Sequence, residues 1–271
     1  MKKLVKGMIA LTMMGALFGC STSKKEQTTL TVFAAASMTE SLDKVIAAYT
    51  KDNPDVTINV NYGSSGDLET QIKEGADVDL FISAGQKQMN EIEAGNELNT
   101  DGSDYVLEGT RVNFLENKVV LCVSDTNKVK LDNFDDLANA LKEGSIVFAM
   151  GNVASVPVGQ YTEQILQHYE LDHAQLANDG KITYCEDVKA VTTAIIEGNV
   201  NCGIIYATDA YSANLTPKCV ATTDLCKQII YPAAIMKNSK NVDATKAFME
   251  YLLSDKAMAE FETVGFTKVK E

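Results

Sequence analysis

Short strand-like runs alternate with helical segments along this 271-residue chain, and this alternation limits the possible fold more than any other feature. Near the start, two segments with apolar residues at helical spacing separate the strand-like runs TLTVFA, VTINVNY and VDLFIS. Such an order is typical of α/β proteins, in which helices cover largely parallel sheets. We therefore predict an α/β fold.

A second series of the same kind begins after Arg111, with the strand-like runs NKVVLCVS, SIVFAM, KITYC and NCGIIYA. QIIYPAAIM is a further extended run, and Pro232 inside it suits an edge or crossing strand, because proline cannot donate to a sheet ladder. One or two amphipathic helices follow. We predict two lobes, the first formed by 30–113 and 231–271 and the second by 114–230.

The first residues look like a targeting segment. Lysines precede GMIALTMMGALFG, an apolar stretch too short to span a bilayer comfortably. It ends in LFGC, which resembles a bacterial lipobox, although Phe18 stands where a smaller residue is usual. We predict a lipoprotein signal peptide at 1–19, a lipidated Cys20 and a flexible tether at 20–29. The protein would then be extracytoplasmic and anchored to the cell membrane by lipid, and ordinary secretion is the alternative.

The chain is acidic, with a formal net charge of −13, and loss of residues 1–19 would remove lysines but no acid. This charge argues against nucleic acid or an anionic membrane surface as a partner. The cysteines other than Cys20 are odd in number, which excludes complete pairing. We expect Cys122 and Cys202 to be buried thiols, whereas the state of Cys185 and a bridge between Cys219 and Cys226 are left open. The chain has no C-x-x-C pair that would indicate a zinc or redox site.

Ser37 stands at a strand-to-helix turn, after three alanines. Glu40 follows three positions later, and this spacing predicts a capping box in which the serine and the glutamate satisfy the first N–H groups of the helix. A helix cap alone would explain the serine. The small residues before it would also keep space open for a ligand at the helix N-terminus.

Three other strand-to-helix turns have the same character. Ser64 and Ser65 lie between a strand and a helix, and Gly63 and Gly66 beside them let the backbone approach closely. Pro157 is expected at the first position of another helix, and Asp187 is expected as the N-cap of a helix that starts at Val188. Ligands of open α/β sheets bind where strands end, so these turns could face one crevice.

Six segments carry a family resemblance: TVFAAASMTESLDKV, NYGSSGDLETQIKEGADVDLFISAGQKQMNE, VPVGQY, EDVKAV, GIIYATDA and YPAAIM. From about Leu30 to Thr267 the chain resembles the molybdate-binding proteins of ABC-type uptake systems. The resemblance implies a two-lobed type II periplasmic-binding-protein fold with the ligand cleft between the lobes. The ligand-binding residues that it implies are Ser37, Ser65, Val158, Val188 and Tyr206. The family usually has alanine at the position of Val158, and valine should preserve a contact made by the backbone N–H.

The resemblance also implies a function: binding of molybdate, and of tungstate, for delivery to an ABC permease driven by its ATPase. We expect no cofactor and a monomer. Molybdate has no proton to donate at neutral pH, so a suitable site consists of hydroxyls, N–H groups and helix N-termini. Another tetrahedral oxyanion such as sulfate is the alternative ligand.

Other receptors fit the sequence less well. A carboxylate receptor would use an arginine fork, and Arg111, the one arginine, is expected at the surface. A receptor for a metal cation would need converging ligands, and His168 and His173 are too far apart to stack on one helix face.

A secreted serine hydrolase is the alternative from another class. Ser37 or Ser65 as nucleophile would need a base, and the chain has neither GxSxG nor a histidine near either motif. Asp79 and Asp209 are expected in structural capping or turn roles, so we predict no catalytic residue. A structural or adhesive lipoprotein is the third reading, and it would respond to no small ligand.

Overall fold

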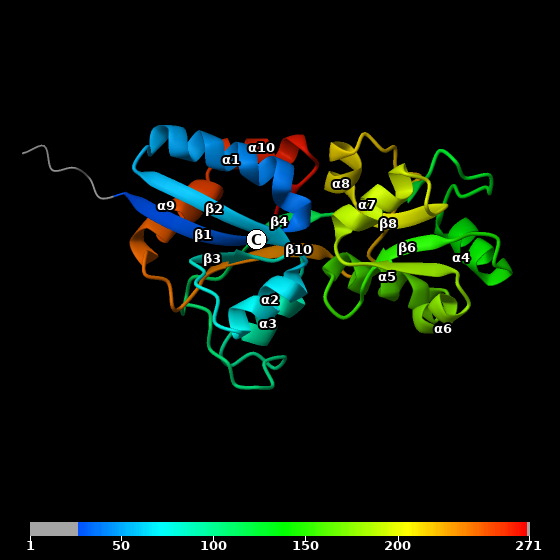
Figure 1. Ribbon diagram of the computed structural model, residues 1–271, viewed down its shortest axis with the longest axis horizontal. Coiled ribbons are helices and arrows are strands. Elements are labelled where there is room, and N and C mark those ends of the chain that lie inside the picture. The colour runs from blue at the N-terminus through cyan, green and yellow to red at the C-terminus, as the bar shows by residue number, and fades with distance from the viewer. Residues whose placement is uncertain (1–26, 270–271) are drawn as a thin grey trace, which may run out of the picture.

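The computed structural model describes residues 27–269 and forms two α/β lobes that lie side by side (Figure 1). Each lobe is built on its own sheet. The predicted signal peptide at 1–19, the lipidation at Cys20 and most of the predicted tether lie outside the described residues. Thr28 and Thr29, predicted as the end of the tether, instead begin the first strand.

The first lobe has a sheet in the order β11-β4-β10-β3-β1-β2. Its strands are β1 (Thr28–Ala35), β2 (Val56–Gly63), β3 (Leu80–Ile82), β4 (Val112–Asn117), β10 (Ile229–Ile235) and β11 (Thr267–Lys268). One face carries α1 (Thr39–Asp52), α9 (Val242–Leu252) and α10 (Asp255–Thr263), and the other carries α2 (Ser65–Lys73) and α3 (Gln86–Ile92) (Figure 1).

The alternation of side chains along β1 explains why both faces of this sheet are covered. Val32 packs in the main hydrophobic core, whereas Phe33 packs in a separate cluster with Leu68 of α2 and Met89 of α3. Successive side chains of a strand point to opposite faces, so an apolar pair such as Val32 and Phe33 requires a helical layer on each side.

The second lobe has a sheet in the order β7-β6-β8-β5-β9. Its strands are β5 (Val119–Val123), β6 (Phe148–Gly151), β7 (Ile182–Cys185), β8 (Cys202–Tyr206) and β9 (Cys219–Val220). Its helices are α4 (Phe134–Glu143), α5 (Pro157–His168), α6 (His173–Asn178), α7 (Val188–Ile196) and α8 (Ala207–Ser212).

The chain crosses between the lobes twice, and both sheets are mixed rather than largely parallel as predicted. β4 runs into β5 through Lys118, and the chain returns from β9 to β10 without a helix between them. The strands that follow these crossings pair antiparallel with their neighbours. β10 pairs with β3 and β4, and β5 pairs with β8 and β9. The strands that end at the cleft, β1 and β6, have parallel neighbours as predicted.

Pro232 lies in the central strand β10, which follows the return crossing from the second lobe, so the crossing alternative holds and the edge alternative does not. β10 is hydrogen-bonded between β3 and β4, and its register shifts between Tyr231 and Pro232. Such an irregularity accommodates a residue that has no N–H. The division into lobes at 113/114 and 230/231 stays a prediction, and the sheets suggest limits after Asn117 and before Ile229.

The cysteines of the described residues are all free, including Cys185. Cys122 and Cys202 are buried, as predicted, and no bridge joins Cys219 to Cys226. Within residues 27–269, no helix has the length and apolar character needed to cross a membrane.

Candidate functional site

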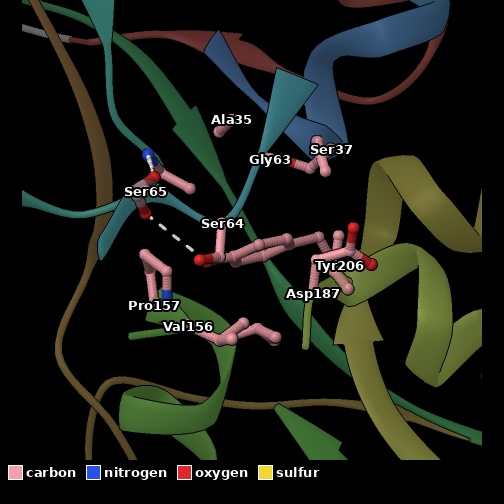
Figure 2. Close-up of a pocket in the computed structure, with 13 residues that line it drawn as sticks. Ala35, Ser37, Gly63, Ser64, Ser65, Val156, Pro157, Asp187 and Tyr206 are labelled. Atoms are coloured by element: carbon pink, nitrogen blue, oxygen red, sulfur yellow. Dashed lines mark hydrogen bonds between the residues drawn. The ribbon is translucent and has the colours of Figure 1, made fainter. Parts of the chain in front are cut away.

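A small cavity lies where the two lobes meet, and it leaves about 10 Å³ for the centre of a water-sized sphere (Figure 2). All the predicted ligand-binding residues line it. The first lobe contributes Ala35, Ala36, Ser37, Gly63, Ser64, Ser65 and Ala84. The second lobe contributes Val156, Pro157, Val158, Asp187, Val188 and Tyr206.

Ser37 does not cap a helix, so the predicted capping box is wrong. A 3-10 turn, η1 (Ala36–Met38), follows β1, and α1 begins at Thr39 without a side-chain cap. The Ser37 hydroxyl lies instead 2.8 Å from the hydroxyl of Tyr231. The extra turn carries Glu40 away from Ser37, and its carboxylate accepts hydrogen bonds from Lys189 at 2.8 Å.

Ser65 is the first residue of α2, and Ser64 is its N-cap, because the Ser64 hydroxyl accepts a hydrogen bond from the Asp67 N–H at 3.2 Å. The Ser65 hydroxyl oxygen accepts a hydrogen bond from the Ala84 N–H at 2.9 Å. Its own hydrogen is therefore available to a ligand. No hydrogen bond among residues 27–269 uses the Ser65 N–H, which is a second donor beside the cavity.

The second lobe presents two helix N-termini to the cavity. Pro157 occupies the first turn of α5, as predicted, and Val158 follows it. The Asp187 carboxylate caps α7 by accepting a hydrogen bond from Ala190 N–H at 2.8 Å, and Val188 is the first helical residue, also as predicted. In the described part of the chain the N–H groups of Val158 and Val188 have no partner, as the first N–H groups of a helix have none within it.

Tyr206 at the end of β8 extends across the cavity toward the first lobe (Figure 2). It is almost completely buried, and its hydroxyl donates to the carbonyl oxygen of Ala84 at a long distance of 3.4 Å. Burial raises the pKa of Tyr206 well above its ordinary value, so the hydroxyl keeps its hydrogen at neutral pH. Tyr206 is therefore a further donor, held by a weak bond that an anion could replace.

The cavity attracts negative charge without a cationic side chain. No lysine or arginine is among the residues that line it, and its one carboxylate, Asp187, is engaged as a helix cap. Partial positive charge comes from the N-termini of α2, α5 and α7, where the N–H groups of Ser65, Val158 and Val188 have no hydrogen-bond partner among the described residues. These donors suit an anion that carries acceptor atoms on all sides. Among the described residues no group of three or more His, Cys, Asp or Glu could hold a metal ion.

Two contacts hold the lobes together beside the cavity. The Gly66 N–H donates to the Ser155 carbonyl oxygen at 2.9 Å, so the glycine expected to face a ligand faces the opposite lobe. The Lys189 ammonium of α7 bonds Glu40 of α1 across the same opening. The structure therefore shows the lobes closed over the cavity.

The arginine and the histidines considered for other receptors lie away from the cavity lining. Arg111 pairs with Glu93 in the first lobe. His173 lies 3.2 Å from a carboxylate oxygen of Glu163 on the second lobe, and His168 is exposed there.

Asp79 and Asp209, the two residues considered as catalytic acids, lie outside the cavity lining. The Asp79 carboxylate accepts hydrogen bonds from the Thr31 N–H at 2.8 Å and from the Ser239 hydroxyl at 2.5 Å, which fits the predicted structural role. Asp209 does not cap a turn as expected. Its carboxylate is buried in α8, 3.3 Å from the Lys189 ammonium and without a hydrogen-bond partner in the described structure.

The sequence did not indicate Tyr231 and Asn117, which lie behind Ser37. Tyr231 belongs to the segment YPAAIM, which contributed to the family resemblance but was assigned no role. The contact between Ser37 and Tyr231 joins residues 194 positions apart, so local patterns could not have revealed it.

The fold and the cavity define a two-lobed solute-binding protein, and the predicted fold class is confirmed. Residues 30–267 match the family described as bacterial extracellular solute-binding protein, and the chain belongs to that family.

Relatives of similar sequence are named as binding proteins. YvgL of Bacillus subtilis, named as a putative ABC transporter substrate-binding lipoprotein, is 35% identical over 95% of this chain and 95% of its own length. The molybdate-binding protein ModA of Haemophilus influenzae is 33% identical over 98% of this chain and 99% of its own length. The periplasmic molybdate-binding protein of Azotobacter vinelandii has a similar structure, with a TM-score of 0.74, 21% identity and coverage of 89% of this chain and 100% of that one.

Proposed function

We propose that this protein binds molybdate, and also tungstate, in the cavity between its lobes and delivers the anion to an ABC permease driven by a cytoplasmic ATPase. The observation that carries the proposal is the set of donors around the cavity, which belong to Ser37, Ser65, Val158, Val188 and Tyr206. Relatives named as molybdate-binding proteins support the choice of ligand.

The energetics of such a site are adequate. A hydrogen bond to a charged group contributes about 1.5–3 kcal/mol net, and micromolar binding needs about 8 kcal/mol. Several converging donors can offset the desolvation of a dianion and leave that amount. The acidic surface is tolerable, because exposed charges are screened beyond roughly 8–10 Å whereas the helix N-termini touch the ligand.

A bound anion would contact both lobes and so favour their closure. Ser37 and Ser65 lie on the first lobe, and Val158, Val188 and Tyr206 lie on the second, so a bound anion would bridge them. A ligand that bonds both lobes favours the closed state by its differential affinity for that state. The permease would then receive a signal that depends on occupancy. We propose capture and release by a monomer without any chemical change of the ligand.

Lipidation at Cys20 would keep the protein at the membrane beside its permease. Metabolic labelling with a radioactive fatty acid should label the wild-type protein and leave Cys20→Ser unlabelled and released into the medium. Labelling of the variant, or retention of the unlabelled variant in the membrane fraction, would contradict the anchor.

Thermal unfolding of the mature protein with each oxyanion tests the ligand class. A ligand that binds only the folded state stabilises it by about 2.7 kcal/mol at a concentration 100 times its Kd. We expect molybdate and tungstate to raise the midpoint temperature, and sulfate and hydrogenphosphate to leave it unchanged. A shift with sulfate alone would instead favour the alternative ligand.

A further inference from the structure

Ser37 is the end of a chain of hydrogen bonds that runs from the crossing between the lobes into the cavity. Asn117, the last residue of β4, lies 3.1 Å from the Tyr231 hydroxyl through its side-chain nitrogen. The Tyr231 hydroxyl lies 2.8 Å from that of Ser37. These three polar residues are all buried, so the direction of each hydrogen bond is set by their own donors and acceptors.

The direction of the chain is fixed at Asn117. The backbone N–H of Lys118, which can only donate, bonds the Asn117 side-chain oxygen at 2.8 Å. The amide nitrogen must therefore face the other way, where it donates to the Thr208 hydroxyl at 3.0 Å and to the Tyr231 hydroxyl. An asparagine whose oxygen is held by an N–H cannot be turned around without the loss of these bonds.

The bond from Asn117 affects how the hydroxyls of Tyr231 and Ser37 are oriented. Its oxygen accepts a hydrogen from Asn117, so its own hydrogen has to find an acceptor. The 2.8 Å contact with Ser37 fits either hydroxyl as donor, and donation from Tyr231 is the arrangement that leaves the Ser37 hydrogen to a ligand. Tyr231 is fully buried against Phe266 and Tyr206, and burial raises its pKa well above the ordinary value, so its hydrogen is retained.

In that arrangement the Ser37 hydroxyl accepts a hydrogen bond from Tyr231, and its own hydrogen points to the cavity. Ser65 is in the same position, because the Ala84 N–H donates to its oxygen. Both serines line the cavity, so both present hydrogens to whatever occupies it.

We propose that Tyr231 and Asn117 are positioning residues that fix Ser37 as a hydrogen-bond donor. They thereby favour oxyanions that carry no hydrogen over those that carry one, such as hydrogenphosphate. This inference rests on the proposed function, since it concerns how the same cavity selects its anion. Neither residue needs to touch the ligand.

A double-mutant cycle tests the proposal with isothermal titration of molybdate. Tyr231→Phe should raise the Kd about three- to tenfold, the effect of one lost neutral hydrogen bond. In the Ser37→Ala background the same substitution should leave the Kd unchanged, because Tyr231 acts through Ser37. Tyr105→Phe is the matched control: it removes a hydroxyl that bonds the Lys73 carbonyl in the first lobe, away from the cavity.

Asn117→Asp provides a second variant that reverses the chain. The carboxylate would accept the Tyr231 hydrogen, and Ser37 would lose its donor. We expect a larger rise in Kd than for Tyr231→Phe, and a smaller rise in the Ser37→Ala background, where only the added charge acts. Hydrogenphosphate, measured by competition, should be rejected less strongly by both single variants than by the wild type.

The titrations distinguish failure of the proposed function from failure of the positioning role. If wild-type protein does not bind molybdate, the proposed function is wrong. If it binds, and Tyr231→Phe and Asn117→Asp either retain the wild-type Kd or act equally with and without Ser37, the positioning role is wrong while the function stands. Circular dichroism at the titration temperature verifies that each variant is folded.

Discussion

Gly66 and Ser155 touch across the cleft, with the Gly66 N–H donating to the Ser155 carbonyl oxygen at 2.9 Å. A Cβ atom on Gly66 would lie 2.5 Å from that oxygen, which is closer than atoms can approach. Neither residue has a strained backbone that would itself require glycine. The absence of a side chain at Gly66 is therefore a requirement of lobe closure.

Gly66→Ala should weaken molybdate binding by tenfold or more, because the Cβ would collide with the opposite backbone only in the closed form. The melting temperature of the unliganded protein should change little. Titration calorimetry gives the affinity, and small-angle scattering with and without ligand reports closure. Ser155→Ala is the control, since it keeps the carbonyl group. Wild-type affinity in Gly66→Ala would remove this contact from the mechanism.

Ser37→Ala and Tyr206→Phe should each weaken binding by about 1–3 kcal/mol, the value of a hydrogen bond to a charged ligand. Each variant removes one hydroxyl from the cavity shown in Figure 2. Calorimetric titration at constant salt measures the loss. Unchanged affinity in both would show that the anion does not bind between these residues.

The Glu40–Lys189 ion pair should contribute little to affinity and do so only at low salt. Glu40→Gln removes a half-exposed pair that joins the lobes, and such pairs are worth about 0–1 kcal/mol. The matched control is Asp52→Asn, which removes the exposed pair with Lys256 inside the first lobe. We expect a weaker affinity for Glu40→Gln alone, and no difference at high salt, where screening is strong. A salt-independent loss would indicate a different role.

Asp209 should make the folded protein less stable as the pH rises from about 4 to about 6. Burial raises the pKa of its carboxyl to about 6 in spite of the Lys189 ammonium nearby. The folded state then binds a proton that the unfolded state has already lost, so stability falls through this window. Urea unfolding of Asp209→Asn across the range should show a flatter pH profile. An unchanged slope would contradict the burial of this charge.

The sequence predicted which residues line the cavity better than it predicted the contacts that these residues make with distant segments. Strand and helix periodicity located β1, β2, β3, β5, β6, β7 and β8, because each is a strand-like run bounded by turn residues, but it did not locate the two-residue strand β9. The resemblance then brought Ser37 and Tyr206 to one cavity. Asp187 and Pro157 were placed correctly, since an N-cap and a first-turn proline are signals confined to one turn.

The errors concern contacts between distant segments. Ser37 and Glu40 have the spacing of a capping box, but Ser37 contacts Tyr231 on a distant strand of the same lobe, and Glu40 contacts Lys189 across the cleft. Pro232 left an edge strand and a crossing strand both open, because the register shift that accommodates it depends on neighbouring strands. Local patterns carry no information about which strands become neighbours across a crossing.

The central claim is most directly tested by isothermal titration of the mature protein with molybdate, tungstate, sulfate and hydrogenphosphate at one salt concentration. We predict tight one-to-one binding of molybdate and tungstate, with no heat of binding from sulfate or hydrogenphosphate. Silence toward all four anions would contradict the account.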